Sequence, residues 1–141
     1  MIPVLSVVGR SGSGKTTLIC NLIPLLKERG YRVATIKHDV HGFAMDIPGK
    51  DTYKHAQAGA DVVVISSREK VAMLEKVGRE LTLDEVIAKI SDVDIIIVEG
   101  YKHNHKPKVE VFRSTQHAEP LCKKEDQLLA VVSDVRPVLG V

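Results

Sequence analysis

The chain has 141 residues, of which 44% are hydrophobic and 27% are charged. This composition is ordinary for a globular protein, and we expect a single domain over residues 1–141. The net charge of +2 is too small to indicate nucleic-acid binding. No apolar run reaches the length of a membrane span, so we expect no membrane association.

Apolar runs alternate with segments of helical spacing along the whole chain. Residues 2–8 form a mostly apolar run that stops at Gly9 and predicts a buried strand. From Lys15, leucines recur at helical intervals as far as Gly30, a natural helix stop. Pro24 lies inside this helix, where we expect it to kink the helix or cost it a hydrogen bond.

The remaining elements continue the alternation. Further strands are predicted at residues 31–37, 61–67, 70–77, 94–100, 108–113 and 127–134. Helices are predicted at 51–58, with Asp51 as the N-cap, and at 81–90. The alternating run 108–113 is typical of an edge strand, whereas 127–134 predicts a buried last strand. This order predicts an α/β fold with a mostly parallel, doubly wound sheet and helices on both faces, in which one strand could be antiparallel.

The two cysteines, Cys20 and Cys122, are about a hundred residues apart and form no Cys-x-x-Cys pair. We interpret them as free thiols in a reducing compartment. The N-terminus has no signal-peptide pattern, so we expect a cytoplasmic protein.

A phosphate-binding loop follows the first predicted strand. The stretch GRSGSGKTT matches the pattern G-x-x-x-x-G-K-[ST], and its members are Gly9, Arg10, Ser11, Gly12, Ser13, Gly14, Lys15, Thr16 and Thr17. Glycines allow the backbone N–H groups to converge on a phosphate, and the helix that follows adds the positive end of its dipole. Lys15 is expected to reach the β- and γ-phosphates, and the Thr16 hydroxyl to bind Mg²⁺.

Besides the P-loop, a site of this kind needs an acidic side chain that organises the Mg²⁺ ion. Glu99 ends the apolar run at 94–100 and is followed by Gly100, where the backbone can turn close to the phosphates. We therefore expect Glu99 to contact the metal or to position a water molecule. These features together predict a fold of the P-loop NTPase type.

Three stretches together resemble one family of this superfamily. They are GRSGSGKTTLICNLIPLLKERGYRVATIKHD, DIPGKDTYKHAQAGAD and IIIVEGYK, and the resemblance spans about residues 2 to 134. It identifies the chain as a member of the MobB family, the P-loop adaptors of molybdopterin-guanine dinucleotide biosynthesis. The resemblance implies a homodimeric, GTP-binding protein with weak GTPase activity. Such a protein assists the guanylyltransferase that attaches GMP to molybdopterin, with molybdopterin itself as a further candidate ligand.

The resemblance also assigns roles by position. Residues 9–17 would hold the phosphates and Glu99 would be the strand-end acid of the family. Asp46, Gly49, Lys50 and Asp51 would match its second loop motif. Members of the family usually carry a further C-terminal helix, whereas this sequence stops at Val141; if that helix helps to wall the base pocket, the resemblance does not extend to base selectivity.

The loop after the second predicted strand is rich in histidine and aspartate. A loop at this position can act as a switch that orders with the triphosphate and relaxes after hydrolysis. Asp46 is our first choice for a contact to Mg²⁺ or water and Asp39 the second, while His38 could position a water. Lys37 or Lys50 could neutralise phosphate charge. The alternative is an ordinary polar loop whose aspartates cap turns.

Two further segments are candidates for ligand contacts. The basic loop at residues 101–108 lies at a strand end, where it could meet a pterin phosphate or an acidic partner, or simply be solvated. Asp134 ends the last predicted strand and could accept hydrogen bonds from guanine, although the Asn/Thr-Lys-x-Asp signature is absent.

Two other functions stay open at this stage. A small-molecule kinase would need a lid with clustered arginines, but the arginines are scattered along the sequence, at Arg10, Arg29, Arg32, Arg68, Arg79, Arg113 and Arg136. A metallochaperone-type GTPase could use His38 and His41, or His103 and His105. Such proteins usually add cysteine or a dense histidine tract, and this chain has neither.

Overall fold

A computed structural model describes residues 1–136 and divides the chain into two compact units. One unit consists of residues 1–40 and 83–141, and the other of residues 41–82. A single domain over residues 1–141 stays a prediction. Among residues 1–136, no helix is long and apolar enough to cross a membrane.

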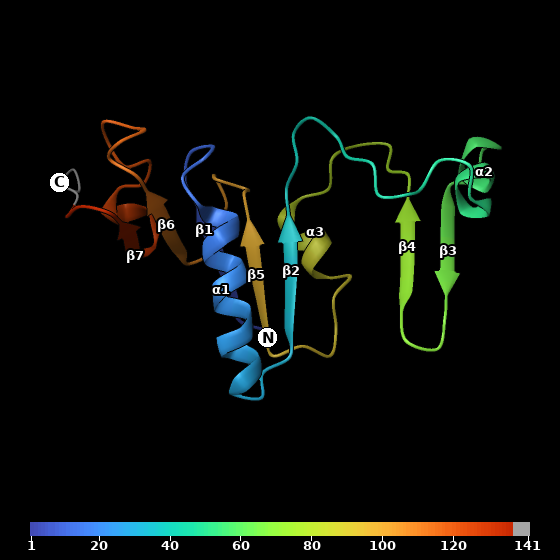
Figure 1. The fold of residues 1–141 in the computed structure, drawn as a ribbon, viewed down its shortest axis with the longest axis horizontal. Helices are drawn as coiled ribbons and strands as arrows, with labels where there is room; N and C mark the ends of the chain where they lie inside the picture. Colours follow the sequence, from blue (N-terminus) through green and yellow to red (C-terminus); the bar gives the residue numbers. More distant parts are fainter. Residues whose placement is uncertain (137–141) are drawn as a thin grey trace. The chain divides into compact units, whose positions relative to one another are not determined.

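The first unit is built on a five-stranded parallel sheet (Figure 1). The strand order is β2-β5-β1-β6-β7. The strands are β1 (Val4–Val8), β2 (Val33–Lys37), β5 (Ile95–Glu99), β6 (Lys108–Phe112) and β7 (Leu128–Ser133). Its other elements are α1 (Lys15–Glu28), α3 (Leu83–Ile87) and a 3-10 turn, η1 (Lys124–Asp126). The predicted parallel α/β sheet is confirmed.

The sheet core has two faces, each covered by one helix. On one face, Val7, Ile97 and Val111 pack with Ile19 of α1. On the other, Ile96 and Val98 pack with Leu83 of α3. Because successive strand residues point to opposite faces, the unbroken Ile/Val run of β5 supplies both cores.

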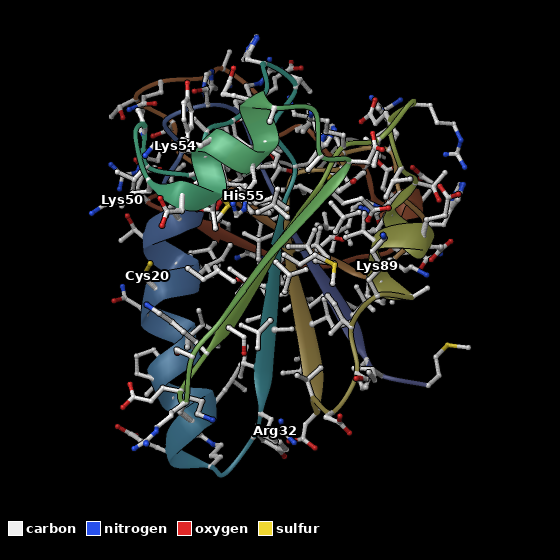
Figure 2. All side chains as sticks on the ribbon, turned by 90° about the vertical axis from the view of Figure 1, so that its right-hand side faces the viewer. Cys20, Arg32, Lys50, Lys54, His55 and Lys89 are labelled. Carbon is white, nitrogen blue, oxygen red and sulfur yellow. The ribbon has the colours of Figure 1, made fainter. Side chains whose placement is uncertain are left out.

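Helix α1 continues through Pro24 without interruption. Pro24 is exposed, so water can bond the carbonyl of Cys20 that the missing N–H leaves free. Cys20 itself points outward from α1 (Figure 2), while Cys122 is buried. Both cysteines are free thiols, as predicted. Burial, together with the nearby Glu110 carboxylate, raises the pKa of the Cys122 thiol to about 11.

Two strand predictions were wrong. Strand β6 lies inside the sheet between β1 and β7, and β7 is the edge strand, with Leu129 and Val132 exposed. The polar residues that make β6 alternate are themselves buried. Lys108 donates to the carbonyls of Asn104, Lys106 and Asp126. Glu110 accepts the N–H groups of Leu121 and Cys122. Buried polar groups that are satisfied in this way are tolerated in a core.

The second unit contains a helix and a β-hairpin. Its elements are α2 (Asp51–Gln57), β3 (Val62–Ser66) and β4 (Val71–Glu75). The two strands pair antiparallel with each other in a sheet of their own. The prediction that Asp51 caps α2 was wrong: the N-cap is Lys50, which makes no side-chain cap bond, and Asp51 lies in the first turn.

We expect Glu110→Ala to lower the free energy of unfolding by about 3 kcal/mol. The change leaves two buried N–H groups without an acceptor and also opens a small cavity. Urea denaturation followed by circular dichroism would measure the effect. Glu125→Ala is the matched control, because Glu125 is an exposed residue of the connection between β6 and β7. It should change stability by less than about 0.5 kcal/mol. Equal effects of the two substitutions would contradict the assigned role of Glu110.

Candidate functional site

The P-loop connects β1 to α1 at the carboxyl edge of the sheet. Gly9 and Gly14 both have positive φ angles, of 146° and 102°. At Gly9 a side chain is also excluded by space, because an added Cβ would lie 2.4 Å from the carbonyl oxygen of Val111 in β6. The loop therefore packs directly on the backbone of the neighbouring strand.

The loop leaves the first turn of α1 open to an anion. The N-cap is Gly14, which makes no side-chain cap bond, and the first turn holds no acidic residue. The N–H groups of this turn have no acceptors within the helix, and the positive end of the helix dipole lies beside them. Ser13 is 1% exposed, and its hydroxyl has no hydrogen-bond partner in the described part of the chain. A ligand with several acceptor oxygens would satisfy all these donors.

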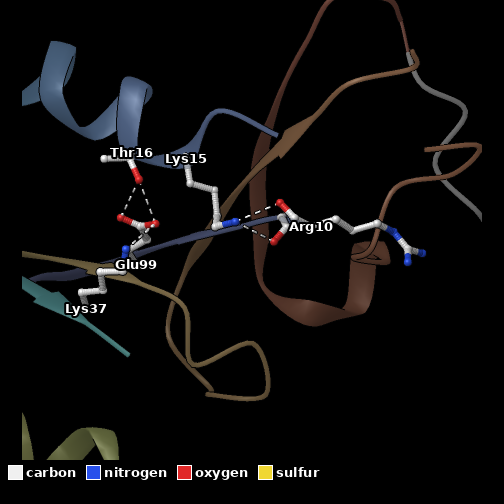
Figure 3. Close-up of polar contacts among 6 residues, drawn as sticks. Arg10, Lys15, Thr16, Lys37 and Glu99 are labelled. Atoms are coloured by element: carbon white, nitrogen blue, oxygen red, sulfur yellow. Dashed lines mark hydrogen bonds and ion pairs between the residues drawn. The ribbon is translucent and has the colours of Figure 1, made fainter. Parts of the chain in front are cut away.

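Lys15 is folded back onto the loop. Its ammonium donates to the carbonyl oxygens of Gly9, at 3.1 Å, and Arg10, at 2.9 Å (Figure 3). The guanidinium of Arg10 points away from Lys15 in the same view. Burial lowers the pKa of Lys15, Glu99 opposes that shift, and the positive charges of Lys102 and Lys37 add to it. An anionic ligand would relieve this convergence of ammonium groups.

Glu99, the last residue of β5, lies opposite the start of α1. Its two carboxylate oxygens accept the Thr16 hydroxyl at 3.0 and 3.2 Å (Figure 3). Lys37 lies 3.9 Å from one of them, and the Glu99 side chain is only 15% exposed. A hydroxyl and a carboxylate are hard oxygen ligands of the kind that Mg²⁺ prefers. Thr16 and Glu99 therefore fit a magnesium ion that is bound together with phosphate oxygens.

The end of β5 is also tied to the start of the histidine-rich loop. His38 donates its backbone N–H to the carbonyl of Glu99, and its ring stacks on Tyr101 at 4.2 Å. A Cβ added at Gly100 would lie 3.1 Å from the Cβ of His38. Strand β2 pairs with β5 and is an edge strand. Strand β5 therefore separates β2, and the loop that follows it, from the P-loop strand β1.

Asp46 belongs to the second compact unit. One of its carboxylate oxygens accepts the N–H of Ile47 at 2.8 Å and the hydroxyl of Thr52 at 3.0 Å. The other has no hydrogen-bond partner within residues 1–136. A contact from Asp46 to Mg²⁺ or water stays a prediction.

The basic loop at 101–108 is less uniform than its sequence indicates. Lys108 is 3% exposed and donates its hydrogen bonds to backbone carbonyls within the fold. Lys106 forms an ion pair with Asp84 at 2.7 Å. Lys102, His103 and His105 are exposed. The positive charge of Lys102 contributes to lowering the pKa of Lys15, so Lys102 lies on the same side of the sheet as the P-loop lysine.

A pocket of about 340 Å³ lies between α1 and the ends of β6 and β7. Ser13, Gly14 and Thr17 line one side, and Arg113 and Asp134 line the other. Asp134 is thus next to the P-loop, as the prediction of a base contact requires. Its carboxylate accepts the N–H of Ser114 at 3.0 Å, which lowers the pKa of that carboxyl. Arg113 was missed, because nothing in the local sequence distinguishes it from the other scattered arginines.

The parallel sheet, the glycine-rich loop and the Thr16–Glu99 pair define a protein of the P-loop NTPase class. The chain belongs to the MobB family: the sequence model described as "Molybdopterin guanine dinucleotide synthesis protein B" matches residues 4–134.

Individual relatives agree with this assignment. The chain is 39% identical over 140 residues to the molybdopterin-guanine dinucleotide biosynthesis adapter protein of Escherichia coli, covering 96% of this chain and 80% of that one. It is 35% identical over 135 residues to the protein of the same name from Haemophilus influenzae, covering 94% and 75%. A crystal structure of molybdopterin-guanine biosynthesis protein B superimposes with a TM-score of 0.74 at 36% identity, covering 95% and 83%.

We expect Gly9→Ala to disrupt the fold or to lower the free energy of unfolding by more than about 3 kcal/mol, because a Cβ would collide with the backbone of β6. Gly30→Ala is the matched control, since Gly30 also has a positive φ but no atom lies within 4 Å of an added Cβ. The control should cost only about 1–2 kcal/mol, the strain of a left-handed residue. Thermal denaturation of both variants would test this, and a milder effect at Gly9 than at Gly30 would contradict it.

Proposed function

We propose that this protein is a GTP-binding adapter that assists the attachment of GMP to molybdopterin by a guanylyltransferase. The carrying observation is the P-loop itself, where the Lys15 ammonium lies beside an uncapped helix N-terminus and the buried Ser13 hydroxyl has no hydrogen-bond partner in the described part of the chain. A Mg²⁺-bound triphosphate has the charge and the acceptor oxygens that such a site lacks. The names of the relatives support the biosynthetic role.

Each residue of the site has a definite task in this proposal. Lys15 would exchange the carbonyls of Gly9 and Arg10 for the β- and γ-phosphates. Thr16 and Glu99 would hold Mg²⁺, and Lys37 would balance charge. When bound, Mg²⁺ neutralises phosphate charge and orients the phosphates.

The same geometry supports slow hydrolysis. Both oxygens of Glu99 accept a hydrogen bond from Thr16, and Lys37 lies beside one of them. Both oxygens are thus already engaged, and a Glu99 carboxylate that holds Thr16 and Mg²⁺ is not at the same time placed to orient an attacking water. We expect GTP hydrolysis by the isolated protein to be well below the 1–100 s⁻¹ that is typical of kinases.

The alternatives receive less support. Within residues 1–136, no group of three or more His, Cys, Asp or Glu side chains could hold a metal ion, so nothing there favours a metallochaperone. Arg10 lies in the P-loop with its guanidinium pointing away from Lys15, and Arg113 comes from the β6–β7 connection, so these two arginines do not form the clustered lid of a small-molecule kinase.

The hairpin of the second unit supports homodimerisation. Cross-strand pairing places Val64, Val71 and Met73 on one face, where they are 52%, 64% and 62% exposed. The one buried hairpin residue, Val63, points to the opposite face. Within the described residues, each strand pairs only with the other, so both outer edges remain open. Exposed apolar faces and open strand edges are common sites of association.

We expect Lys15→Ala to abolish GTP binding while leaving the fold intact, because the lysine side chain contacts only loop carbonyls. Titration calorimetry with GTP and ATP, with and without Mg²⁺, would measure this.

The wild-type chain should prefer GTP, and Thr16→Ala should remove most of the Mg²⁺ dependence. Equal affinity for GTP and ATP, or rapid phosphoryl transfer to a pterin or nucleoside, would contradict the proposal.

We expect Met73→Glu to shift the protein from dimer to monomer. Dimerisation through the apolar face of the hairpin would bury the new carboxylate without an opposite charge, which is costly. Light scattering coupled to size exclusion would report the mass. Glu69→Lys, in the exposed turn of the same hairpin, is the control and should leave the mass unchanged. A wild-type chain that is monomeric at micromolar concentration would refute this part of the proposal.

A further inference from the structure

The side chain of Arg113 packs against the last glycine of the P-loop. From a Cβ added at Gly14, the distances to the Arg113 atoms Nη2, Nε and Cζ are 3.4, 3.7 and 3.9 Å. Since these three atoms belong to one plane and lie at similar distances, the guanidinium faces Gly14. Within residues 1–136, no hydrogen bond or ion pair occupies this guanidinium.

The pocket beside Arg113 has the features of a built ligand site. Its volume of about 340 Å³ is within the range of small-molecule sites. Ser13 lines it, almost fully buried and with its hydroxyl unpartnered in the described part of the chain. Thr17 and Asn21 contribute polar groups from the first turns of α1. A buried donor, a free cation and an uncapped helix N-terminus therefore meet in one place.

The direction of the nucleotide follows from the charges. Lys15, Thr16 and Glu99 mark where the β- and γ-phosphates and Mg²⁺ would lie. The pocket begins on the other side of Gly14 and ends at the ionised Asp134, which repels phosphate. A nucleotide would accordingly place its nucleoside toward Asp134 and its α-phosphate between Thr17 and Arg113.

We propose that Arg113 binds the α-phosphate of the nucleotide and thereby fixes the nucleoside in this pocket. The inference rests on the proposed nucleotide-binding function and adds to it a cation from outside the P-loop. A guanidinium can grip two phosphate oxygens at once, which a lysine at the same position could not do.

The connection that carries Arg113 is anchored on both sides of its turn. The N–H of Ser114 is held by Asp134, and those of Leu121 and Cys122 are held by the buried Glu110. The backbone that carries Arg113 is therefore held in place before a ligand arrives.

The test is calorimetric titration of GDP with Mg²⁺ into the full chain and its variants. Arg113→Ala should weaken the affinity for GDP and for GTP alike by about 10- to 100-fold, which corresponds to the loss of one charge-assisted hydrogen bond. Arg113→Lys should fall between that variant and wild type. Arg29→Ala is the matched control, because Arg29 is an exposed arginine at the far end of α1 and should leave affinity unchanged.

Phosphorus NMR of bound GDP separates a phosphate contact from a general effect on the fold. Loss of Arg113 should move the α-phosphate resonance and leave the β-phosphate resonance in place. Affinity within threefold of wild type, or an unchanged α resonance, would overturn this inference alone. Failure of the wild-type chain to bind any guanine nucleotide would instead overturn the proposed function, and this inference with it.

Discussion

The parallel pairing of β1 with both β5 and β6 is the constraint on which the site depends. Parallel strands end at the same edge of a sheet, so the residues after β5 and β6 are delivered to either side of the P-loop. Glu99 arrives on one side and Arg113 on the other. The packing is tight enough that Gly9 has no room for a side chain beside the backbone of β6. The glycine, the acid and the arginine are thus consequences of one strand order.

The electrostatics of the site follow from the same arrangement. Lys15, Lys37 and Lys102 come from three separate segments, yet two of them act on the pKa of the third. One carboxylate, Glu99, partly balances them and also holds Thr16. Positive charges near a helix N-terminus repel one another in the unliganded protein, and they attract a bound polyanion.

The hairpin of β3 and β4 shows that strands can be predicted correctly while their pairing is not. Both strands were predicted, but as members of one doubly wound sheet. Only a tight turn at residues 67–70 joins them, and parallel pairing needs a crossover of a dozen residues or more. Antiparallel pairing with each other was the outcome that the connection length favoured. What the apolar face of this hairpin contacts is not encoded in its alternation.

The sequence by itself determined the P-loop, the strand and helix elements and the acid at Glu99, because each depends on neighbours within a few residues. It also carried the family resemblance that the comparisons bear out. Only the tertiary structure decided that β6 is internal and β7 is the edge, since Lys108 and Glu110 look solvent-facing until their buried backbone partners are seen. Only the tertiary structure placed Arg113 against Gly14. That contact joins residues about a hundred positions apart, and strand order, which local patterns do not specify, brings them together.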